Sequence, residues 1–99
     1  MDPDQKENLA ELSKALGHPH RIKILHILAN LPCDSQCMVG NIVDRLPISQ
    51  STVSQHLKIL KNAGWIKGNI DGPKVCYCLE EDIVEDYRGI FNSIFTDEE

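Results

Sequence analysis

Apolar side chains recur at helical spacing in five stretches of the chain. Neighbouring apolar positions lie three or four residues apart in each stretch, which is the period of one face of an α-helix. The predicted helices cover about residues 4–16, 19–29, 39–46, 50–63 and 82–95. Pro19 suits a first helical turn, Ser49 is an expected N-cap, and Gly64 is an expected C-terminal stop. The inner stripe predicted for the fourth helix is Val53, Leu57, Ile59 and Leu60.

A different pattern separates the fourth helix from the fifth. The runs "WIKGNI" and "PKVCYCL" resemble strands and flank an Asp-Gly pair, a common hairpin signal. Val75, Tyr77 and Leu79 form the apolar face of the second strand, so Cys76 and Cys78 are predicted to point toward water. Short helices followed by a hairpin predict a mainly α winged helix-turn-helix fold with a small β-sheet, five helices and a β-hairpin wing. We expect a single domain over residues 1–99, with the first and last helices available for dimerisation.

Size and composition fit one domain. The chain has 99 residues, 41% of them hydrophobic, which is enough for one modest core. Because no run of eighteen apolar residues exists and the N-terminus is polar and acidic, we expect neither a membrane span nor a signal peptide. Four cysteines without a secretory signal favour a reducing compartment, so a cytoplasmic protein is expected.

The charge is unevenly distributed along the chain. A formal net charge of -5 argues against a nucleic-acid partner, but eight of the fifteen acidic residues lie in the last twenty positions. Residues 49–79 carry four lysines against Asp71 alone. A local basic region of this kind is sufficient to meet a DNA duplex.

The polar face at the start of the fourth helix suits contact with double-stranded DNA. Glutamine pairs bidentately with adenine, serine and threonine reach base edges or phosphates, and lysine binds phosphates. The alternative is an ordinary solvated helix face. The candidate DNA-binding residues are Gln50, Ser51, Thr52, Ser54, Gln55, His56, Lys58, Lys61 and, on the wing, Lys74, with Lys67 beside it.

Three segments carry a family resemblance: "SKALGHPHRIKILHIL", "ISQSTVSQHLKILKNAGWI" and "GNIDGPKVCYCL". Over roughly residues 9–95 the chain resembles the ArsR/SmtB family of winged helix-turn-helix transcriptional repressors. The resemblance implies a homodimer that binds an inverted-repeat operator and leaves it when an inducer binds. The apolar residues expected at the dimer interface are Leu9, Leu12, Ile83, Tyr87, Ile90, Phe91 and Ile94, although a purely intramolecular core is the alternative.

The chain departs from two metal sites of that family. Met38 and Gly40 occupy the positions where the family's thiolate site has a Cys-x-Cys pair, with Cys37 one place earlier. The family's C-terminal zinc site uses histidine, and residues 82–95 contain none. Neither site can be transferred to this chain.

The four cysteines are the remaining candidates for sensing. Fold geometry predicts that Cys37 lies beside Cys76 or Cys78, which would gather Cys33, Cys37, Cys76 and Cys78 at one end of the sheet. Thiolates bind thiophilic ions, so As(III), Sb(III), Cd(II) and Zn(II) are the candidate ligands. Two alternatives remain open, a reversible disulfide switch and simple packing of small apolar side chains.

Other chemistry is weaker. His18 and His20 flank Pro19 and are expected to cap or pack, with metal ligation as the less favoured alternative, while His26 is expected on a helix face. The chain lacks a Gly-rich phosphate loop and a nucleophile elbow, so an enzyme is not expected. The sequence therefore predicts a DNA-binding repressor released by metal or metalloid binding to cysteines. A thiol-redox repressor and an interaction module with structural zinc are the alternatives.

Overall fold

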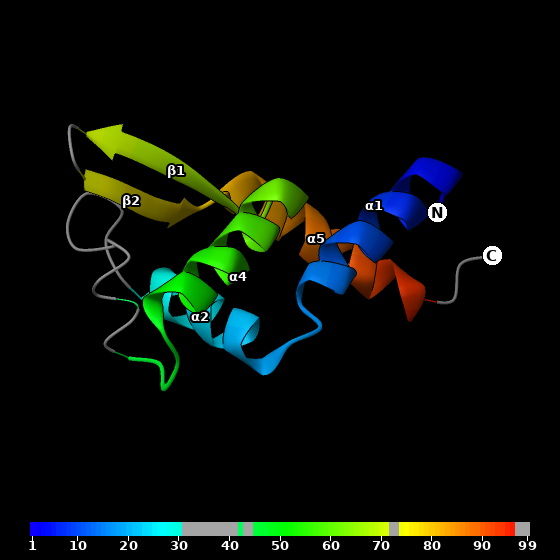
Figure 1. Cartoon of the computed structure of the whole chain (residues 1–99). Helices are drawn as coiled ribbons and strands as arrows, with labels where there is room; N and C mark the ends of the chain where they lie inside the picture. The colour runs from blue at the N-terminus through cyan, green and yellow to red at the C-terminus, as the bar shows by residue number, and fades with distance from the viewer. Residues whose placement is uncertain (31–41, 43–44, 72–73, 97–99) are drawn as a thin grey trace.

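The computed structural model describes residues 1–30, 42, 45–71 and 74–96. In these residues the chain forms α1 (Pro3–Ala15), α2 (Pro19–Ala29), α4 (Gln50–Ala63), the strands β1 (Ile66–Asp71) and β2 (Lys74–Leu79), and α5 (Glu81–Ile94). Figure 1 shows the hairpin at one end of the protein and both termini, with α1 and the end of α5, at the other. Four helices are thus found, against five predicted; the helix expected over 39–46 lies mostly outside the described residues.

Local capping explains where the helices begin and end. At α1, Asp2 and Gln5 form a reciprocal capping box. The hydroxyl of Ser49 accepts a hydrogen bond from the backbone N–H of Thr52 at 3.3 Å, as the sequence predicted for an N-cap. At the other end of α4, Gly64 has a φ of 104°, in the left-handed region that favours glycine. These caps fix α4 at the predicted bounds.

Gly64→Ala is expected to lower the free energy of unfolding by about 1–2 kcal/mol, because a side chain strains the left-handed backbone. A Cβ at this position meets nothing within 4 Å, so backbone strain is the only cost. Gly89→Ala is the matched control: Gly89 lies inside α5 without positive φ and its Cβ also meets nothing. The control should stabilise the protein by about 0.5–1 kcal/mol. Urea unfolding at one fixed protein concentration measures both changes, and equal effects at the two glycines would contradict the strain argument.

The core lies where α2, α4 and the sheet meet. Val53, Leu57 and Leu60 have no exposed surface, as their spacing predicted. The prediction is wrong for Ile59, which is 42% exposed, whereas His56 is buried at 8% exposure. The buried stripe 53, 56, 57, 60 follows the i, i+3, i+4, i+7 rule, and position 59 lies off it.

The two strands form an antiparallel hairpin in which Lys67 opposes Cys78 and Asn69 opposes Cys76. This confirms the predicted wing. The expectation that both cysteines face water is wrong for Cys78, which is 5% exposed and belongs to the core cluster. Contacts between α2 and β2 explain the difference, because a strand covered by a helix on its presumed outer face does not need to alternate between apolar and polar residues.

A polar and aromatic contact joins α1 and α5 to the core. The indole N–H of Trp65 donates to the carbonyl of Leu12 at 2.8 Å, and the hydroxyls of Ser13 and Tyr87 lie 2.9 Å apart. Leu12 and Leu9 are 6% and 9% exposed, so both are mostly covered within the protomer, and their place in a dimer interface stays a prediction. In the part of the chain described here, no helix is long and apolar enough to cross a membrane.

Candidate nucleic-acid interface

The outer face of α4 is polar and solvent-exposed. Its buried stripe holds the helix against the core, which leaves the opposite side free for a partner. The exposed members of the predicted DNA-binding set on this helix are Gln50, Ser51, Thr52, Ser54, Gln55, Lys58 and Lys61. All of these side chains are therefore accessible to a duplex, while their contact with DNA stays a prediction.

The hydroxyl groups at the start of α4 have different surroundings. Ser49 Oγ lies 3.1 Å from Ser51 Oγ and 3.0 Å from Thr52 Oγ1, so these three hydroxyls form a small network at the helix start. Within the described part of the chain, the side chains of Ser54 and Gln55 make no hydrogen bond. Their polar groups are therefore free to meet base edges, whereas Ser51 and Thr52 also shape the helix end.

Basic side chains flank this face. Lys58 and Lys61 are exposed on α4, and Lys67 is exposed on β1. Gly68 lies on β1, where the hairpin approaches α4: a Cβ there would stand 3.7 Å from the Lys61 ammonium and 3.3 Å from the Tyr77 ring. Lys74 begins β2, so the wing sequence carries a second lysine. This arrangement places positive charge along the edge of the polar face, where phosphates would lie.

His56 differs from the rest of the predicted set. Its side chain is buried and contacts Arg21, whose Nη1 donates to His56 Nδ1 at 3.3 Å. Its ring also lies 4.6 Å from the ring of His18, measured between centroids. The structure thus does not place His56 on the exposed face predicted for it, and DNA contact by this residue, which its burial disfavours, stays a prediction. The sequence held the signal, because position 56 shares the helical face of Val53 and Leu60.

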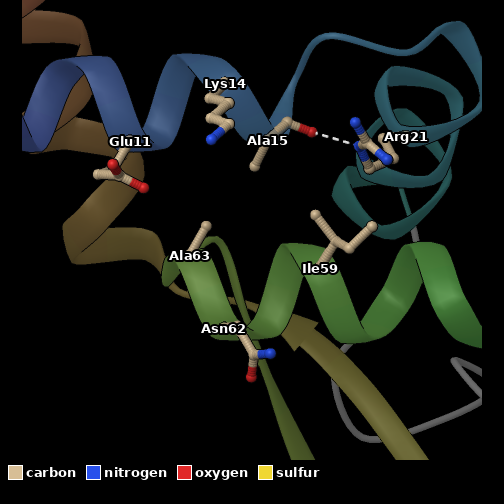
Figure 2. Close-up of a pocket in the computed structure, with 7 residues that line it drawn as sticks. All are labelled: Glu11, Lys14, Ala15, Arg21, Ile59, Asn62 and Ala63. Atoms are coloured by element: carbon tan, nitrogen blue, oxygen red, sulfur yellow. Dashed lines mark hydrogen bonds between the residues drawn. The ribbon is translucent and has the colours of Figure 1, made fainter.

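His18 has the capping role predicted from sequence. Its Nδ1 accepts a hydrogen bond from the backbone N–H of His20 at 3.1 Å, which caps α2 ahead of Pro19. His26 is exposed on α2, also as predicted. Arg21 connects the two segments, since its Nε donates to the carbonyl of Ala15 at 2.6 Å (Figure 2). The turn between α1 and α2 is therefore tied to α4 through Arg21 and His56.

In metal-free protein, acidification is expected to destabilise the fold through His56. Burial, and then the nearby charges of His18, Arg21 and His20, lower the pKa of His56 below 6.5. The unfolded chain then binds a proton more readily than the folded chain, so stability falls as the pH drops through 6.5 toward the folded-state pKa. Urea unfolding between about pH 8 and pH 5 measures the slope. His56→Gln should flatten it and His26→Gln should not; an unchanged slope in His56→Gln would contradict the assignment.

A hollow of about 410 Å³ opens between α1, the start of α2 and the C-terminal half of α4. Figure 2 shows Glu11 and Lys14 on one side and Ile59 and Asn62 on the other. Ile59 lines this hollow, which accounts for an apolar side chain outside the core stripe. The hollow does not include any of the predicted DNA-binding residues.

The cysteines of β2 are not free thiols in this structure. Cys76 and Cys78 are both disulfide-bonded. Cys76 is half-buried and Cys78 is buried beside a cavity of about 260 Å³ that Leu28, Lys67 and Glu81 also line. Cys33 and Cys37 lie outside the described residues, so the predicted four-cysteine site is described only in its β2 half.

Comparison with known proteins identifies relatives of this chain. Residues 18–67 match the model of the arsR family of bacterial regulatory proteins. An uncharacterized helix-turn-helix transcriptional regulator of Methanocaldococcus jannaschii is 37% identical over 84% of this chain and 90% of its own length. The transcriptional repressor SmtB of Mycobacterium tuberculosis is 45% identical over 72% of this chain, but the match spans only half of SmtB.

Solved structures agree with the sequence relatives. One, named as a possible transcriptional regulator for arsenical resistance, has a TM-score of 0.72 and 28% identity, covering 88% of this chain and 85% of that chain. HlyU of Vibrio cholerae has a TM-score of 0.69 and 27% identity over 96% of this chain and 98% of its own. These matches confirm the winged helix-turn-helix architecture and agree with the expectation that the chain is not an enzyme. The chain therefore belongs to the ArsR family of bacterial regulatory proteins.

Proposed function

We propose that this family member is a homodimeric repressor that binds an operator duplex and leaves it when a thiophilic metal or metalloid binds its reduced cysteines. Because its operator would lie on chromosomal DNA, we place the protein in the cytoplasm. The observation that carries the DNA half is the exposed polar face of α4, flanked by the lysines of α4 and the wing. Ser54 and Gln55 supply base contacts, and Lys58, Lys61 and Lys67 supply phosphate contacts.

The uncovered face of α5 supports dimerisation. This helix has no fully buried residue, although Ile83, Val84 and Tyr87 pack partly on the core. Phe91 and Ile94 remain 45% and 49% exposed. A second copy would bury this apolar surface, because isologous contacts pair the same patch on both subunits. Of the predicted interface residues on α5, we therefore keep Ile90, Phe91 and Ile94, which do not pack on the core. We add Phe95, which is 73% exposed.

The position of the cysteines supports a route from inducer to DNA. Cys76 and Cys78 lie on the wing strand, and the register pairs Cys78 with Lys67, a candidate phosphate contact. The backbone N–H of Glu80, two residues after Cys78, donates to the carbonyl of Trp65 at 2.9 Å, directly after α4 ends. An ion that draws the sulfurs together would shift β2 and with it the wing. The names of two relatives, a cadmium resistance regulator of Staphylococcus aureus and the arsenical resistance structure, are consistent with thiophilic inducers.

Fluorescence anisotropy tests the proposal. Fully reduced, metal-free protein is titrated onto duplex from its own upstream region, with and without stoichiometric arsenite, and then with Cd(II) or Zn(II). Tight, salt-dependent binding that collapses with one of these ions is the expected result. Binding that none of the ions affects would overturn the inducer assignment. A protein that binds no duplex and unfolds on zinc removal would instead be an interaction module with structural zinc.

Oxidation is a second candidate trigger, favoured by the disulfide-bonded state of Cys76 and Cys78 in this structure. The same anisotropy experiment separates it from metal sensing. Peroxide-treated protein would no longer bind the operator, even in the absence of any metal, and a thiol reductant would restore binding. Equal affinity of the reduced and oxidised protein would exclude this trigger.

A further inference from the structure

Three imidazole rings meet at a place that the DNA-binding and cysteine functions do not use. His18 and His20 come from the start of α2, and His56 comes from the middle of α4. Their ligand atoms all lie within 4.8 Å of one another. The ring centroids are 5.1 Å apart for His18 and His20, 4.6 Å for His18 and His56, and 5.9 Å for His20 and His56. Residues 38 positions apart in sequence thus converge on one point.

The donors and their burial suit a transition-metal ion. Neutral imidazole nitrogen is a common ligand of Zn(II), and three histidines with one open position are a known donor set. Zn–N bonds of about 2.0–2.1 Å place tetrahedral ligand atoms roughly 3.3 Å apart, so modest side-chain rotations complete the geometry. His56 is buried while His18 and His20 are half-buried, which leaves an entry path from solvent.

Two hydrogen bonds change when an ion binds. His18 Nδ1 accepts the capping bond from the His20 backbone, and His56 Nδ1 accepts from Arg21. Coordination through Nε2 moves the ring proton to Nδ1, which can then no longer accept either bond. Arg21 Nη1 would then face a second donor at His56 Nδ1, so the guanidinium would have to turn away from this ring about its Nε, which donates to the Ala15 carbonyl. This exchange also separates the guanidinium charge from the cation.

We propose that His18, His20 and His56 form a binding site for a divalent transition-metal ion such as Zn(II), which ties the start of α2 to the middle of α4. The site is separate from the cysteines of β2 and does not depend on their chemistry. It lies on the buried side of α4, whereas Ser54 and Gln55 lie on the exposed side of the same helix. A bound ion therefore holds α4 in place from its buried side, opposite the residues proposed to contact DNA.

The test is a Zn(II) titration of metal-free, full-length protein by isothermal calorimetry. The protein is first oxidised until no thiol reacts with a thiol reagent, because disulfide sulfur does not replace thiolate as a zinc ligand. One Zn(II) per chain is expected to bind and to raise the melting temperature. His20→Gln should weaken binding at least tenfold. His26→Gln, an exposed histidine of the same helix, should bind as the unaltered protein does.

A second measurement needs no substitution. Imidazole nitrogen signals in NMR spectra of the unaltered protein should shift on Zn(II) addition for His18, His20 and His56, and stay in place for His26. Absence of one-to-one binding would overturn the site. The same conclusion follows if His20→Gln keeps full affinity or if the three imidazoles do not respond.

Discussion

Ser54→Ala combined with Gln55→Ala is expected to weaken operator binding by tenfold or more while the fold stays intact. Both side chains are exposed on α4 and, in the described part of the chain, neither makes a hydrogen bond. A good base-edge contact discriminates by about 1–3 kcal/mol, and about 1.4 kcal/mol corresponds to a tenfold change in affinity. Because alanine favours helix formation, the double variant should not lose stability.

Anisotropy at fixed salt measures this loss, on the operator and on a scrambled duplex. Loss of base contacts should reduce the affinity for the operator far more than the affinity for the scrambled duplex. The matched control is Asn62→Ala, an exposed polar residue near the end of the same helix that lines the hollow beside α1. It should bind the operator normally. An equal loss in both variants would mean that α4 is perturbed as a whole, and an unchanged double variant would remove this face from recognition.

The features that the sequence predicted best are local ones. The bounds of α2 and α4 follow from Pro19, Ser49 and Gly64, each of which acts within one helical turn. The hairpin follows from the Asp-Gly pair between two strand-like runs. No tertiary contact is needed for these predictions, so the architecture could be read before any packing was known.

The errors concern which face of an element is covered. His56 was assigned to the polar face because of its chemistry, although its position puts it on the stripe of Val53 and Leu60. Ile59 was assigned to the core because its side chain is apolar, although its position lies off the buried stripe. It lines a hollow instead. Burial depends on helical phase more than on residue type, and a buried histidine needs partners that only the tertiary structure supplies. Arg21 and His18 are those partners.

The cysteines of β2 show where the alternation of apolar and polar residues along a strand fails to predict burial. Val75, Tyr77 and Leu79 predicted a single apolar face, which holds only if one side of the hairpin meets solvent. In the structure α2 contacts β2, and Cys78 is more buried than Tyr77 or Leu79. Sequence reasoning thus found the cysteines that matter for the proposal, but it could not place Cys78 inside the core.

Cys76→Ala combined with Cys78→Ala is expected to leave operator binding of the reduced protein nearly unchanged and to abolish its response to arsenite. Neither side chain belongs to the polar face of α4, so the duplex contacts persist. Alanine is preferable to serine because Cys78 is 5% exposed, and a hydroxyl buried there without a partner would cost about 1–3 kcal/mol. Alanine leaves only a small cavity, for which about 1 kcal/mol is a reasonable estimate.

Anisotropy with and without arsenite, together with urea unfolding of the same samples, separates signalling from stability. The two single variants, Cys76→Ala and Cys78→Ala, distinguish metalloid binding from a dithiol switch. If a metalloid needs three thiolates, each single substitution should weaken the response, whereas a dithiol switch should be abolished by loss of whichever cysteine belongs to the reacting pair. A double variant that still releases DNA on arsenite addition would show that β2 does not sense the inducer. The wing would then act only as a phosphate contact, since its lysines are unaffected by the substitution.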